Sequence, residues 1–177
     1  MLLSRGTAMG GILLAVVMLF MTAAFLSPIA DFALFSLTSL CIAVMVIYSG
    51  YRGGVILYFA ASVLIFAFFG IVFSLPFIFF FGIYPILKGL IESKISKWKA
   101  FALKSFLFMA FAAVGIAGIS TLSGMMQMTY FLDDLPEIFG EYRIIAAGGA
   151  IVISFMIYDQ ALTLAIGVIG KFLPSKR

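Results

Sequence analysis

The segment Val55–Leu87 is 33 residues long and strongly apolar, and it contains no charged residue. As one helix it would measure about 50 Å, whereas the hydrocarbon core of a membrane is about 30 Å thick and is crossed by about 20 residues. The run is continuous, which excludes the alternating strands of an outer-membrane barrel. Because 65% of the chain is hydrophobic and 10% is charged, a soluble fold could not bury this apolar surface. The sequence predicts an all-α integral membrane protein.

Two short helices explain the long run better than one, because Gly70, Ser74 and Pro76 supply turn residues at its midpoint. Other apolar runs flank it, and we expect the first of them to be a retained span rather than a cleaved signal. The chain is thus expected to be a single transmembrane domain, residues 1–177. The six expected spans are residues 6–26, 32–48, 55–70, 74–91, 100–119 and 145–171.

The distribution of charge favours six spans with both termini inside, because lysine and arginine collect on the cytoplasmic side of a membrane. With six spans, ten of the eleven basic residues lie on the side of the chain ends. With a single span at 55–87, the basic connection Lys88–Lys99 would lie opposite Arg5 and Arg52. We expect a multi-pass protein of the bacterial plasma membrane. The net charge of +4 then faces anionic lipid and does not indicate nucleic-acid binding.

The residue types that most enzymes use are missing from this chain. It has no histidine, and its one cysteine, Cys41, sits in an apolar run as a small core residue. The sequence contains no phosphate-binding loop, dinucleotide fingerprint, zinc-protease motif or serine-hydrolase elbow. We therefore expect neither an enzyme nor a bound cofactor or metal.

Asp159 is the most informative single residue, because it lies near the middle of the sixth expected span. A carboxylate at this depth costs about 2.5–3.5 kcal/mol on insertion scales, so it should face protein or water. We predict a substrate pocket at Asp159 and Gln160, although the glutamine points about 100° away around the helix. The alternative is a neutral or paired carboxyl that fixes helix packing.

A second polar cluster marks the cytoplasmic end of the fourth expected span. Pro85 predicts a kink, and Lys88 and Glu92 are spaced to pair on one helix face. Tyr84 precedes Lys88 by one turn, and Lys104 in span five can extend to the same level. These five residues form a predicted cytoplasmic interface. They could act as an anchored helix end or as a docking surface or gate.

Small residues give the first span a face for close helix contact, at Ala8, Gly11 and Ala15. This face could serve internal packing or contact with a partner helix. The outer loop Thr121–Glu141 combines methionines and aromatic residues with four acidic residues. It could fold as a lid over an outward-facing pocket or as a helix at the membrane interface.

The architecture resembles the substrate-binding S components of energy-coupling-factor transporters, with six short spans, a small-residue face on span one, a long last span and the turn Tyr51–Gly54. More locally, Phe80–Lys88 with Glu92 is similar to an FFGxYPxxKxxxE motif of uncharacterised Firmicutes six-span membrane proteins, over about Ser36–Phe108. The first resemblance implies capture of a small molecule from outside and contact between the span-one face and a transmembrane coupling partner.

The expected function is therefore that of a substrate-capture subunit of a small-molecule uptake system. It would work with a separate transmembrane coupling protein and ATPases, and its ligand is not identified by the sequence. One alternative is a non-transporting scaffold that resembles rod-shape-determining membrane proteins. Another is an autonomous channel or small carrier, which the carboxylate of Asp159 would permit.

Overall fold

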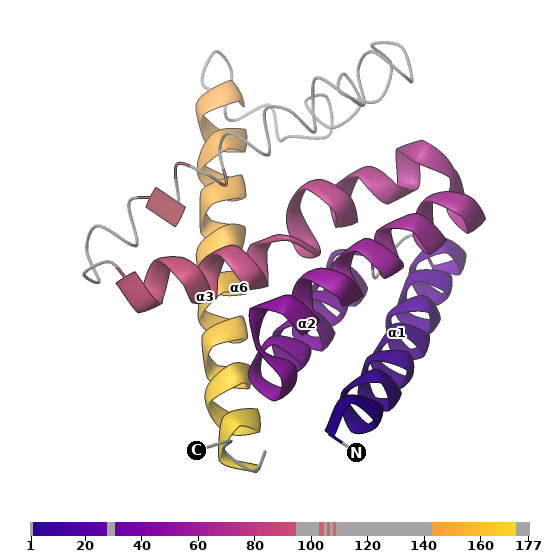
Figure 1. Cartoon of the computed structure of the whole chain (residues 1–177). Helices are drawn as coiled ribbons and strands as arrows, with labels where there is room; N and C mark the ends of the chain where they lie inside the picture. The colour runs from indigo at the N-terminus through magenta and orange to yellow at the C-terminus, as the bar shows by residue number, and fades with distance from the viewer. Residues whose placement is uncertain are drawn as a thin grey trace.

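The computed structural model describes residues 2–27, 31–94, 103, 104, 106, 108 and 143–172, and all its regular elements are helices. Figure 1 shows α1 lying beside the folded helix α2, while α3 crosses the long C-terminal helix α6. The elements are α1 (Leu2–Leu26), α2 (Asp31–Pro76), the π-helix η1 (Phe77–Phe81), α3 (Tyr84–Lys94) and α6 (Arg143–Phe172).

Helix α2 is interrupted at two glycines that adopt backbone angles unavailable to most residues. Gly50 has φ 79° and ψ 179°, and Gly70 has φ 78° and ψ 175°. A side chain would clash in this region of the backbone map, so it is occupied almost only by glycine. Each glycine separates two helical segments, which gives the zigzag path of α2 and α3 in Figure 1.

Residue pairs across the Gly70 break show that the chain reverses direction there. A Cβ added to Gly82 would lie 2.7 Å from the ring of Tyr58, and one added to Gly89 would lie 3.3 Å from Tyr51. Both pairs are centred on Gly70, as in an antiparallel helical hairpin. This break lies at one of the residues where the sequence predicted a turn.

The segment before Gly50 packs closely against the segment after it. A Cβ added to Gly53 would lie 2.6 Å from the Cβ of Ser49, and one added to Gly54 would collide with Val46. Residues 49–54 were expected to form a connection between spans, and the break at Gly50 lies within that range. Helix resumes directly after Gly50. Gly53 and Gly54 serve close helix packing, a role that sequence alone does not distinguish from turn formation.

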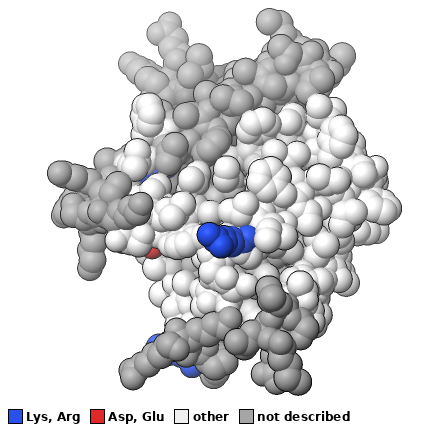
Figure 2. All heavy atoms as spheres, in the orientation of Figure 1, with Lys and Arg blue, Asp and Glu red and all other residues white. Residues whose placement is uncertain are grey.

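The surface of the described chain suits lipid rather than water. Three helical stretches are long and apolar enough to cross a membrane, and the second of them contains both glycine breaks: Gly6–Leu26, Phe32–Ser93 and Val152–Lys171. Large apolar side chains on these stretches are exposed, including Ile56 at 70% and Phe68 at 71%. Figure 2 shows a face that is white over most of its described area, with few charged side chains. Apolar exposure on this scale is characteristic of a membrane-facing surface.

The buried face of α1 carries apolar residues at helical spacing, and they pack against α2. They are Leu13, Val17, Met21 and Ala24. The same core continues through the aromatic residues of η1 to the middle of α6. This continuity places α3 and the centre of α6 next to each other.

The π-helix η1 forms a wider helical turn between Pro76 and α3. Its closing hydrogen bond runs from Gly82 N to Phe77 O over 2.7 Å. Two of its carbonyl groups are bound by side-chain hydroxyls from other segments, since Tyr58 donates to Ile78 O at 2.9 Å and Ser39 donates to Phe81 O at 2.5 Å. These bonds satisfy buried backbone acceptors and fix where α3 begins.

Most of the fifth expected span, 100–119, and the outer loop 121–141 lie outside the described residues. Four residues of that span are described as helical, and Lys104 and Phe108 are directed inward. The ring of Phe108 stacks on Phe155 of α6, with their centroids 4.3 Å apart. The start of this segment therefore packs against α6.

Candidate functional site

Asp159 of α6 is the centre of a buried ion cluster. Its Oδ1 accepts hydrogen bonds from Tyr84, at 2.5 Å, and from Lys88, both on α3. Its Oδ2 accepts a hydrogen bond of 2.8 Å from Lys104. Asp159 is 7% exposed, so both oxygens are satisfied by protein groups in the interior. Three segments far apart in the sequence thus meet at one carboxylate.

Glu92 closes the cluster from the surface side. Its Oε1 lies 3.1 Å from the Nζ of Lys88 and 2.8 Å from the Nζ of Lys104. The four charged groups therefore form a ring in which each ammonium contacts both carboxylates. We call these residues, Lys88, Glu92, Lys104 and Asp159, the four-charge ring.

The four-charge ring is electrically balanced, with two positive and two negative groups. The side chains of Lys88, Lys104 and Asp159 are 2%, 8% and 9% exposed, whereas that of Glu92 is 42% exposed. Buried charges are tolerated when they are paired and their hydrogen bonds are satisfied. The arrangement can hold α3, α6 and the Lys104 segment together, and its one accessible member is Glu92.

Neighbouring hydroxyls complete the polar environment. Thr163, one turn after Asp159, accepts a 2.8 Å hydrogen bond from Lys88 and donates one of 2.7 Å to Asp159 O. Tyr158 donates a 2.7 Å hydrogen bond to Ser39 on α2. The tyrosine ring also packs against Tyr84, with centroids 5.4 Å apart. Aromatic and hydroxyl contacts therefore fix the α6 turn that carries Asp159.

The structure joins two predicted sites that the sequence treated separately. Asp159, the predicted pocket carboxylate, contacts Tyr84, Lys88 and Lys104 of the predicted cytoplasmic interface. The predicted Lys88–Glu92 pair is present. Of the two interpretations of Asp159, the contacts match the paired carboxyl that fixes helix packing.

The other members of the two predicted sites do not join the ring. Gln160 is exposed, in keeping with its expected direction away from Asp159. Pro85 is buried in the first turn of α3, directly after the interruption at residues 82–83. The expected kink is thus present as a break before a new helix, where proline's missing N–H does little harm.

Three side chains of this polar environment were not predicted from the sequence, namely Ser39, Tyr158 and Thr163. Thr163 carried a usable signal, since it lies four residues after Asp159 and therefore on the same face of the helix. Ser39 had no such signal in the sequence, because a serine in an apolar helix commonly forms a hydrogen bond with its own backbone.

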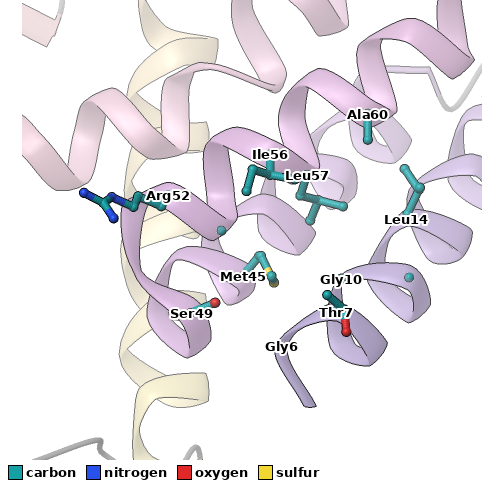
Figure 3. A pocket seen from close by; sticks show the side chains of 12 residues that line it. Gly6, Thr7, Gly10, Leu14, Met45, Ser49, Arg52, Ile56, Leu57 and Ala60 are labelled. Carbon is teal, nitrogen blue, oxygen red and sulfur yellow. The ribbon is translucent and has the colours of Figure 1, made fainter. Parts of the chain in front are cut away.

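A separate cavity of about 530 Å³ lies between α1 and α2 near the Gly50 break. Figure 3 shows Thr7 and Leu14 of α1 facing Met45 and Leu57 of α2 across it, with the guanidinium of Arg52 directed away from α1. Small-molecule sites have volumes of this order and mostly apolar walls. The sequence did not identify this cavity, which depends on the fold bringing glycines of two helices together.

The predicted partner-helix residues Ala8, Gly11 and Ala15 are exposed on α1. Gly11 also lines the cavity, and a Cβ added to it would have no atom within 4 Å. The face is therefore open, and it borders the cavity.

Comparisons were made with protein-family models, with curated proteins and with solved structures. None of the three finds a match to this chain.

Proposed function

We propose that the chain is a substrate-capture subunit of a small-molecule uptake system in a bacterial plasma membrane, working with a separate transmembrane coupling protein and ATPases. The observation that carries the proposal is the 530 Å³ cavity between α1 and α2. It offers space for a small apolar or amphipathic molecule. The open small-residue face of α1 lies beside it and suits contact with a partner helix.

The proposed topology has six spans with both termini in the cytoplasm. The Gly50 break then lies on the inner side and the Gly70 break on the outer side. The cavity falls in the inner half of the membrane, which is where an imported molecule is released.

This topology predicts opposite locations for two connections. Reporter tags inserted at residue 94 and at residue 134 should be found in the cytoplasm and outside, respectively, because lysines follow the first site and acidic residues surround the second. Alkaline phosphatase and green fluorescent protein fusions measure this. Finding both tags in one compartment would contradict six spans and the assignment of the cavity to the inner half.

The substitution Gly11→Leu should strongly lower recovery of the coupling protein without unfolding the chain. A Cβ at position 11 has no atom within 4 Å, so the chain should still fold, and the side chain should interfere with an object that docks on α1 or enters the cavity that Gly11 borders. Native mass spectrometry of gently purified protein detects the partner subunits and any bound small molecule in one measurement. We expect partner signal to fall at least about tenfold, equivalent to 1.4 kcal/mol.

The matched control is Gly167→Leu on α6, which also has no atom within 4 Å of an added Cβ. It should leave partner recovery unchanged. If both variants retain the partner equally, the α1 face is not the docking surface.

A non-transporting scaffold is the second candidate, and the four-charge ring is the observation that favours it. Both carboxylate oxygens of Asp159 accept hydrogen bonds from protein groups. A scaffold predicts a change of cell shape on deletion and no small molecule retained through purification. An uptake subunit predicts normal cell shape on deletion, poor growth on a limiting nutrient and a small molecule retained through purification.

A further inference from the structure

Glu92 differs from the other members of the four-charge ring in its accessibility. Its side chain is 42% exposed, while the two lysines that it contacts are 2% and 8% exposed. One oxygen, Oε1, contacts both ammonium groups. The carboxylate therefore lies between two buried ammonium groups and the accessible surface.

The charges make an anion at this position necessary. Asp159 supplies one negative charge to two lysines, so the ring without Glu92 would carry a net charge of +1. Tyr84 and Thr163 contribute hydrogen bonds but no charge. An uncompensated buried charge is costly, so another anion would be drawn to the place that Glu92 left.

We propose that Lys88 and Lys104 form a binding site for a small oxyanion, a phosphate or carboxylate group, and that Glu92 occupies this site as a tethered competitor. Ammonium groups bind such oxyanions through short charge-assisted hydrogen bonds. The site is near the C-terminal end of α3, and Glu92 is its most exposed member. The proposal holds whether or not the chain works with a coupling protein.

Tethering explains why the intact chain should bind free anions weakly. A side chain attached four residues from Lys88 has a high effective concentration at the site. Removing its charge should reveal the affinity of the two lysines. The substitution Glu92→Gln keeps the size of the side chain and removes the competing carboxylate.

The test titrates purified protein in neutral detergent with inorganic phosphate. Calorimetry measures the binding affinity, and the midpoint of thermal unfolding measures the stabilisation. Glu92→Gln should bind phosphate at least about tenfold more tightly than the natural chain. Adding Lys104→Gln to this variant should abolish the gain. Adding Lys171→Gln, an exposed lysine at the end of α6, should leave it intact.

The same variants in lipid nanodiscs identify the source of the anion. Stabilisation of Glu92→Gln by free phosphate in phosphatidylcholine indicates a soluble ligand, whereas stabilisation only by phosphatidylglycerol indicates a lipid headgroup. If Glu92→Gln unfolds without anions, its recovery by phosphate supports the site. The proposal is overturned if neither source stabilises Glu92→Gln, or if Lys171→Gln weakens binding as much as Lys104→Gln.

Discussion

Asp159→Asn should lower the free energy of unfolding by about 3–5 kcal/mol, the range for removing one partner of a buried ion pair. Asparagine keeps the shape of the side chain, so the loss reports charge rather than packing. Lys88 and Lys104 would remain buried with Glu92 as the one negative charge left in the ring. Thermal and denaturant-induced unfolding in neutral detergent measure the effect.

Two further variants separate this effect from general damage to α6. Gln160→Asn changes the exposed neighbour of Asp159 and should shift stability by no more than about 0.5 kcal/mol. The double variant Asp159→Asn/Lys88→Met leaves Lys104 balanced by Glu92, so it should recover much of the loss. A single variant that unfolds like the natural chain, or a double variant no more stable than the single, would show that the ring does not stabilise the fold.

The sequence predicted the all-helical class and several local features, because each depends on residues close together in the chain. The apolar run at 6–26 corresponds to α1, and a turn residue within Val55–Leu87 corresponds to the break at Gly70. The Lys88–Glu92 pair follows from helix geometry alone. Such features need no knowledge of how the helices pack.

The four-charge ring could be predicted only in part. A carboxylate at the middle of a membrane helix predicts a partner or water, but the sequence does not identify which lysine or hydroxyl group supplies the contact. The actual partner Lys88 is 71 residues away, and α3 meets α6 because of the hairpin at Gly70 and the π-helix before α3. Side chains that meet through such a path leave no periodic signal in the sequence.

The same limit applies to the separate roles of the glycines within residues 49–54. Glycines indicate a turn when the local backbone requires them, as at Gly50, and close packing when a neighbouring helix requires them, as at Gly53 and Gly54. The sequence pattern is identical in both cases. Only the positions of Ser49 and Val46 across the hairpin distinguish the two roles.

Gly82→Ala tests this packing role at a position where an added Cβ would meet a backbone atom that cannot move aside. The added Cβ would lie 2.7 Å from the ring of Tyr58 and 2.9 Å from the carbonyl oxygen of Phe77. That carbonyl accepts the closing bond of η1, and the tyrosine is held by its hydrogen bond to Ile78 O. Overpacking of this kind costs about 1–3 kcal/mol, so the variant should melt at a clearly lower temperature.

The control for Gly82→Ala is Gly167→Ala, which changes an exposed glycine inside α6 with no atom within 4 Å of the new Cβ. There alanine should stabilise the helix by up to about 1 kcal/mol, because it restricts the unfolded chain and favours helical backbone angles. The two variants should therefore shift the unfolding midpoint in opposite directions. Equal shifts would mean that Gly82 is not in close contact with Tyr58, and the antiparallel packing of the Gly70 hairpin, which positions Lys88 for Asp159, would then be wrong.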